Sequence, residues 1–151
     1  MNMTRKILVL FLFLFISPVV GLGEEIIDSS NITERSDGGV YLVYKKFSNK
    51  PFTGTITGRV QSKIVNGFFE GPYLLFCDSG QISDEGQHRR SVRVGYWIHY
   101  DIDCSGNWMM KGPYNKDGEK DGVWLLFPED GFVFRWVYQN DSLVESTRAK
   151  Q

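Results

Sequence analysis

The stretch GVWLLFPEDG (residues 122–131) decides the fold that this sequence predicts, because the chain writes the same phrase twice before it. The earlier versions are GPYLLFCDSG (71–80) and GYWIHYDIDCSG (95–106). Each begins with a glycine, carries aromatic side chains two and five residues later, and closes on a second glycine. The residues at these positions are Gly71, Tyr73, Phe76 and Gly80; Gly95, Trp97, Tyr100 and Gly106; and Gly122, Trp124, Phe127 and Gly131. The starts lie 24 and 27 residues apart, which is within the range of structural repeats.

Each repeat predicts one β-hairpin, because an aromatic strand is followed by a glycine turn and a return strand. Segments such as VYLVY (40–44) and FVFRWVY (132–138) are rich in the aromatic and branched residues that strands favour. Sixteen glycines and five prolines interrupt the chain, and no apolar stripe of helical period runs through it. The predicted fold class is all-β, a single-layer antiparallel sheet of stacked β-hairpin repeats.

The repeated phrase resembles that of the MORN-repeat-variant family, some members of which are called YwqK-type antitoxins. KPFTG (50–54) is similar to an opening segment of these proteins, and KGPYNKDGEKDG (111–122) to their inter-repeat linker. The resemblance covers about residues 40–131, and the first unit, taken as 40–54, does not itself begin with a glycine. It implies a MORN-like sheet in which the motif residues are structural, and it implies no catalytic chemistry.

The phrase also predicts how its residues pack. We expect the first glycine to let the incoming turn lie close to the preceding hairpin, and the aromatic rings to stack on their counterparts in the next hairpin. Strand alternation places Trp97 and His99 on one face, and Ile98 and Tyr100 on the other. Two interpretations stay open: the aromatic residues form the core of a curved sheet, or one face is an aromatic groove that receives a ligand.

The first residues of the chain predict export. Arg5 and Lys6 precede the apolar run ILVLFLFLFI (7–16), and a small-residue segment then ends at Gly23. This is the pattern of a secretory signal peptide, residues 1–23, and the apolar run is too short to span a bilayer. We therefore expect a periplasmic or secreted protein without a transmembrane span after cleavage. Residues 24–39 are expected to be a flexible lead-in, 40–138 the MORN-variant repeat domain, and 139–151 a polar C-terminal tail.

Two cysteines in an exported chain suggest one disulfide, between Cys77 and Cys104. Both precede the closing glycine of a repeat, so they occupy matching turns of neighbouring hairpins. Equivalent positions two strands apart are separated by about 9.6 Å, beyond the usual reach of a disulfide. A bridge therefore requires that the two turns curl toward each other, and a pair of free thiols is the alternative.

The sequence contains no catalytic motif. His99 and Cys104 can be drawn as a base and a nucleophile, but residues near one strand end are a weak geometric case. DIDCSG (101–106) matches the opening of a calcium loop, yet Gly112 stands where the bidentate glutamate is required. We therefore predict a turn there, no metal, no cofactor and no enzymatic activity. The formal net charge of −1 and the lack of a basic stripe exclude nucleic acid as a partner.

A repeat sheet of this kind predicts a non-enzymatic protein–protein interaction module that works in the cell envelope or outside it, with an unidentified protein partner. Four aromatic residues lie outside the shared phrase and are expected to form the partner face: Trp108, Phe132, Trp136 and Tyr138. The alternative is a module that binds a glycan or an envelope lipid on the same aromatic side chains.

Overall fold

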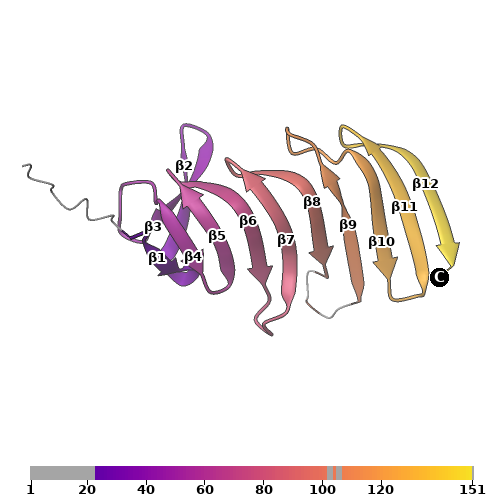
Figure 1. Ribbon diagram of the computed structural model, residues 1–151, viewed down its shortest axis with the longest axis horizontal. Coiled ribbons are helices and arrows are strands. Elements are labelled where there is room, and N and C mark those ends of the chain that lie inside the picture. Colours follow the sequence, from indigo (N-terminus) through magenta and orange to yellow (C-terminus); the bar gives the residue numbers. More distant parts are fainter. Residues whose placement is uncertain (1–22, 102–103, 105–106, 151) are drawn as a thin grey trace, which may run out of the picture.

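The structure is a computed structural model that describes residues 23–101, 104 and 107–150 of the 151-residue chain. The predicted signal peptide lies outside these residues except for Gly23, and so does Gly106, the closing glycine of the second phrase. Twelve strands and one 3-10 turn follow each other (Figure 1): β1 (Ile26–Asp28), η1 (Ser29–Asn31), β2 (Ile32–Asp37), β3 (Val40–Lys45), β4 (Gly54–Thr57), β5 (Val60–Val65), β6 (Phe68–Phe76), β7 (Ile82–Arg89), β8 (Val92–Tyr100), β9 (Trp108–Tyr114), β10 (Gly122–Pro128), β11 (Phe132–Gln139) and β12 (Ser142–Lys150).

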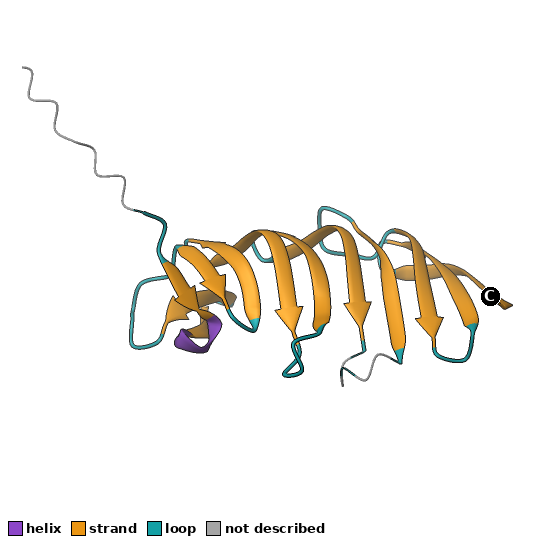
Figure 2. Cartoon of the chain, turned by 60° about the horizontal axis from the view of Figure 1, so that its bottom comes forward, coloured by secondary structure: helices purple, strands orange, loops and turns teal. Residues whose placement is uncertain are grey.

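Ten strands form one open sheet in the order β1-β4-β5-β6-β7-β8-β9-β10-β11-β12. From β4 to β12 each strand pairs with the next in an antiparallel arrangement, while β1 runs parallel to β4. Figures 1 and 2 show this as a row of consecutive hairpins, which confirms the all-β antiparallel sheet predicted from the repeats. Among the residues described, no helix is long and apolar enough to cross a membrane.

The pairing register sorts the side chains of the large sheet onto two faces. Trp97 lies opposite Gly112, and Trp124 lies opposite Trp136. We call the side that carries Trp97, Trp124 and Trp136 the aromatic face. The other side, the opposite face, mixes apolar and charged residues, because one row across it pairs Glu85, Ile98, Lys111, Leu125 and Arg135 in succession.

At the N-terminal end a second sheet, the β2–β3 hairpin, lies against the large one. Val43 of β3 joins Phe52, Ile56 and Ile64 in the main hydrophobic core, where none of these side chains is more than 3% exposed. Ile64 pairs with Phe69. Since the Phe69 ring packs on Tyr73 at 5.5 Å, the core passes directly into the aromatic face. The hairpin therefore covers the aromatic face at this end of the sheet.

Two segments that were predicted to be unstructured are strands. Residues 26–37, within the expected flexible lead-in, form β1, η1 and β2, and residues 142–150 of the expected polar tail form β12. These predictions are wrong because both segments are held by backbone pairing, which a polar sequence does not reveal. β12 is exposed at every residue and pairs with β11 along its whole length. The turn before it is built on Asn140 and Asp141, both at positive φ (47° and 61°), as a tight hairpin turn requires.

Candidate binding face and groove

The two repeat tryptophans are fully buried although the sheet around them is a single layer. Trp97 and Trp124 are both 0% exposed. Each indole ring lies flat over a glycine of the neighbouring return strand, Trp97 over Gly86 and Trp124 over Gly112. A Cβ atom on Gly86 would come within 2.6 Å of Cγ of Trp97, and one on Gly112 within 2.7 Å of Cε2 of Trp124. Large and small side chains therefore alternate along this row, and the glycines provide the space for the rings.

Each indole is also fixed by a hydrogen bond to the residue that follows its glycine. Nε1 of Trp97 donates to the carbonyl of Gln87 at 3.1 Å, and Nε1 of Trp124 donates to the carbonyl of Pro113 at 2.9 Å. The same arrangement thus occurs in both repeats. Sequence reasoning missed Gly86 and Gly112, although EGQ (85–87) and KGP (111–113) precede the two tryptophans by similar distances.

His99 joins the two tryptophans into one stack. Its ring lies 5.7 Å from Trp97 and 5.9 Å from Trp124, with interplanar angles of 17° and 11°. Asp84 on β7 holds the imidazole, with Oδ1 2.6 Å from Nδ1. We predicted that the aromatic rings of one phrase stack on the equivalent rings of the next. Among the first aromatic residues of the three phrases, Tyr73 and Trp97 are in direct contact, with ring centres 5.7 Å apart. The two tryptophans contact each other through the histidine.

The second aromatic of each phrase behaves differently. Tyr100 and Phe127 both lie opposite Met109 on the opposite face, and Lys111 sits 5.1 Å from the centre of the Phe127 ring. Among the described residues, no ring contact joins Phe76, Tyr100 and Phe127 to one another. Stacking of these three rings was therefore a wrong prediction, since Met109 separates two of them.

The first glycine of each phrase is needed mainly for its backbone conformation, and less because another segment of the chain lies close to it. Gly71 and Gly95 adopt φ of 77° and 68°, and nothing lies within 4 Å of a Cβ built on either. Only Gly122, at φ 102°, also has a close neighbour, Pro113 Cγ at 3.2 Å from such a Cβ. The predicted close approach is thus wrong for the first two phrases, where a left-handed backbone explains the glycine. The closing glycines Gly80 and Gly131 lie in turns at φ 84° and 74°.

The four residues predicted to form a partner face all lie on the aromatic face. Trp136 is paired with Trp124, and Phe132 and Tyr138 share its side of β11 by alternation. Trp108 lies opposite Pro128, on the same side of the sheet. All four side chains are partly exposed. The sheet therefore gathers these residues from β9 and β11 onto one surface.

Basic side chains lie over the rings of this surface. Nζ of Lys120 is 4.7 Å from the ring centre of Trp124 and 5.1 Å from that of Tyr138. The guanidinium of Arg148 lies 3.6 Å from the centre of the Phe132 ring. Burial lowers the pKa of Lys120, whose amine is partly withdrawn from solvent against the rings. Lys120 and Arg148 therefore place positive charge against the rings in the C-terminal half of the aromatic face, and Arg148 is also ion-paired with Asp130 at 3.2 Å.

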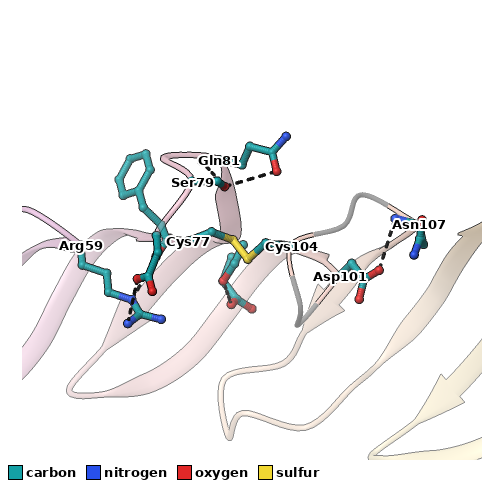
Figure 3. Close-up of a disulfide and its surroundings, with 11 residues drawn as sticks. Arg59, Cys77, Ser79, Gln81, Asp101, Cys104 and Asn107 are labelled. Carbon is teal, nitrogen blue, oxygen red and sulfur yellow. Dashed lines mark hydrogen bonds and ion pairs between the residues drawn. A yellow bond between two sulfur atoms is a disulfide. The ribbon is translucent and has the colours of Figure 1, made fainter.

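The two cysteines form a disulfide, which confirms the predicted pairing (Figure 3). Their Cα atoms are 6.2 Å apart, although two strands separate the turns that carry them. The turns reach toward each other, Cys77 in a tight turn closed by a hydrogen bond from Gly80 N–H, and Cys104 at φ 61°. Because its sulfur is bound to Cys77, Cys104 is not a nucleophile for His99. Most of the calcium-like loop lies outside the described residues.

Beside the disulfide, the aromatic face is hollowed into a groove of about 430 Å³. Its apolar lining comes from Leu75, Trp108, Met110 and the two cysteines, and its polar lining from Arg59, Ser83, Asp84, Arg93, His99 and Tyr114. Phe76 and Tyr100, at the ends of β6 and β8, complete it. The disulfide therefore fixes one wall of the groove.

Four of the polar groups within the groove form one connected chain. Ser83 Oγ donates to Oδ2 of Asp84 at 2.7 Å, Asp84 Oδ1 meets His99 Nδ1, and His99 Nε2 lies 3.3 Å from the Tyr114 hydroxyl. Burial alone would raise the pKa of Asp84, but the hydrogen bonds from His99 and Ser83 bring it below its usual value. Burial raises the pKa of Tyr114, so its hydroxyl stays protonated. Both carboxylate oxygens are thus already engaged inside the protein.

No protein-family model matches the chain, and no characterised protein matches its sequence. The molecule is an open repeat sheet with one aromatic, partly cationic face and a groove stapled by a disulfide.

Proposed function

We propose that this chain is a non-enzymatic, MORN-variant repeat protein that acts outside the cytoplasm as a protein–protein interaction module. The observation that carries the proposal is the unequal covering of the aromatic face. The β2–β3 hairpin covers it over β4–β6, whereas no described segment covers it over β9–β11, where Trp108, Phe132, Trp136 and Tyr138 lie.

The covered end indicates the kind of partner. There the β2–β3 hairpin lies on the face, with Val43 packed against Ile56, Ile64 and Phe52. The partner surface we propose is likewise a β-hairpin or sheet with apolar side chains. Acidic residues at its rim would meet Lys120 and Arg148, since complementary charges favour encounter and fix register.

Two features support a location of the protein in the periplasm or outside the cell. The first is the signal-peptide pattern of residues 1–23. The second is the Cys77–Cys104 disulfide, because such bonds persist in oxidising compartments.

The test is chemical cross-linking of the tagged protein in its native cells, with quantification of the cross-linked proteins by mass spectrometry. We expect one stoichiometric protein partner, and its yield should fall at least about fivefold with Trp136→Gln. The matched control is Val123→Gln, which changes an exposed residue (40% exposed) of the neighbouring strand on the opposite face and should leave the yield unchanged. No enriched protein, or equal losses from both variants, would contradict the proposal.

Binding of a glycan or an envelope lipid is the second candidate. The cations over the rings of the aromatic face favour it, because anionic glycans and lipids combine apolar surface with negative charge. Tryptophan fluorescence during titration with envelope glycans and with lipid vesicles tests it. A saturable spectral change supports this candidate, and unchanged spectra with all of them eliminate it.

A further inference from the structure

The groove beside the disulfide has the dimensions and lining of a small-molecule site. Its volume of about 430 Å³ lies in the range of ligand pockets, and it combines an apolar lining with a few polar groups, as such pockets do. Leu75, Met110 and Trp108 supply much of the apolar part. A hollow of this volume suits a compact molecule with one or two rings.

Two arginines, Arg59 and Arg93, and one carboxylate, that of Asp84, line the groove. The carboxylate of Asp84 is hydrogen-bonded to Ser83 and His99, and it also interacts electrostatically with Arg93. Arg93 lies over the rings of Trp97 and Tyr114, at 5.1 and 6.0 Å from their centres. Among the residues that the structure describes, no carboxylate oxygen lies within 4 Å of its guanidinium nitrogens.

The other basic residue of the groove adds to this positive field. Arg59 is 3.3 Å from Asp78, but both side chains are well exposed, so their pairing is weak. The disulfide keeps one wall of the groove in place whether or not a ligand is present. A preorganised, partly apolar hollow lined by two guanidinium groups and one carboxylate carries excess positive charge and is complementary to an organic anion.

We propose that this groove binds a small amphipathic anion, with an aromatic or alicyclic body against Leu75, Met110 and Trp108 and a carboxylate or sulfonate against Arg93. Arginine suits this role because its planar fork can donate two hydrogen bonds to such a group. The site goes beyond the proposed protein-binding function, since it needs no protein partner.

The test uses two fluorescent probes that share one body and differ in charge. They are 8-anilinonaphthalene-1-sulfonate, which is an anion, and N-phenyl-1-naphthylamine, which is neutral. The purified, disulfide-bonded chain should bind the anion at one site, at least about tenfold more tightly than the neutral probe. Arg93→Met should lower the affinity for the anionic probe at least about tenfold, because one charge-assisted contact is removed while an apolar side chain over Trp97 is kept. Arg93→Lys should give an intermediate loss.

Arg135→Met is the matched control, since Arg135 forms an ion pair with Glu145 away from the groove and should not affect either probe. Amide and indole chemical shifts of the wild-type chain provide a second readout that needs no variant. The anion should shift the signals of Leu75, Met110 and the Trp108 indole. Equal affinity for the two probes, unchanged affinity in Arg93→Met, or shifts confined to β11 would each overturn the site. Trp136→Gln should leave anion binding intact, so failure here and failure of the protein-binding proposal are distinguishable.

Discussion

Adding one methyl group under a buried tryptophan is the sharpest perturbation of the repeat. Gly112 has no positive φ, so Gly112→Ala brings no backbone strain, and in an open strand it would stabilise by several tenths of a kcal/mol. Here the new Cβ would lie 2.7 Å from Cε2 of Trp124, a fully buried ring. Overpacking of this kind costs about 1–3 kcal/mol. We expect Gly112→Ala to lower the free energy of unfolding by about 2 kcal/mol.

A double-mutant cycle identifies the cause. In a Trp124→Ala background the methyl group has space, so Gly112→Ala should be neutral or stabilise by about 0.5 kcal/mol, giving a coupling energy of about 2 kcal/mol. Gly95→Ala is the control, because its cost comes from φ of 68° with nothing within 4 Å, and should be the same in both backgrounds. Urea unfolding followed by far-UV circular dichroism measures all variants. An equal cost of Gly112→Ala with and without the tryptophan would refute the packing that we describe.

Three further predictions concern stability. Trp97→Ala and Trp124→Ala should each cost about 3–5 kcal/mol, since both rings are fully buried, and unchanged thermal midpoints would show that the rings do not support the fold. Burial lowers the pKa of His88 to about 4. Between pH 6.5 and 4 this imidazole is therefore protonated in the unfolded chain and neutral in the folded chain. Stability should therefore fall on acidification through this window, by about 1–2 kcal/mol once solvent screening of a partly exposed ring is allowed for, and His88→Gln should remove this part of the pH dependence. The unreduced protein should show no reactive thiol, and replacing Cys77 and Cys104 by serine should cost about 3–4 kcal/mol; two titratable thiols would disprove the bridge.

The repeats made the central sheet predictable. Three phrases in register gave the hairpins, because glycine turns and aromatic strands are local signals. The pairing of the two cysteines was predictable, but the distance between them was not. Flat strands about 4.8 Å apart would separate equivalent positions two strands away by about 9.6 Å, whereas the turns bend so that the Cα atoms of Cys77 and Cys104 lie 6.2 Å apart.

The rest depended on partners that lie far away in the chain. β12 has no apolar alternation, so only the backbone groups of β11 reveal it as a strand. Gly86 and Gly112 carry no local signal of their role, which comes from the indole rings of Trp97 and Trp124 that lie over them. His99 likewise gained its role from three strands at once, with Asp84 on one side and a tryptophan on each face of its ring.

Site-specific photo-cross-linking tests most directly whether the aromatic face receives a protein. A benzophenone amino acid at position 136, in the exposed half of the aromatic face, is compared with the same group at position 123 on the opposite face. The structure predicts that one protein is captured in the native cells from position 136 and not from position 123. Equal capture from both positions, or none from position 136, would contradict a binding function for the aromatic face.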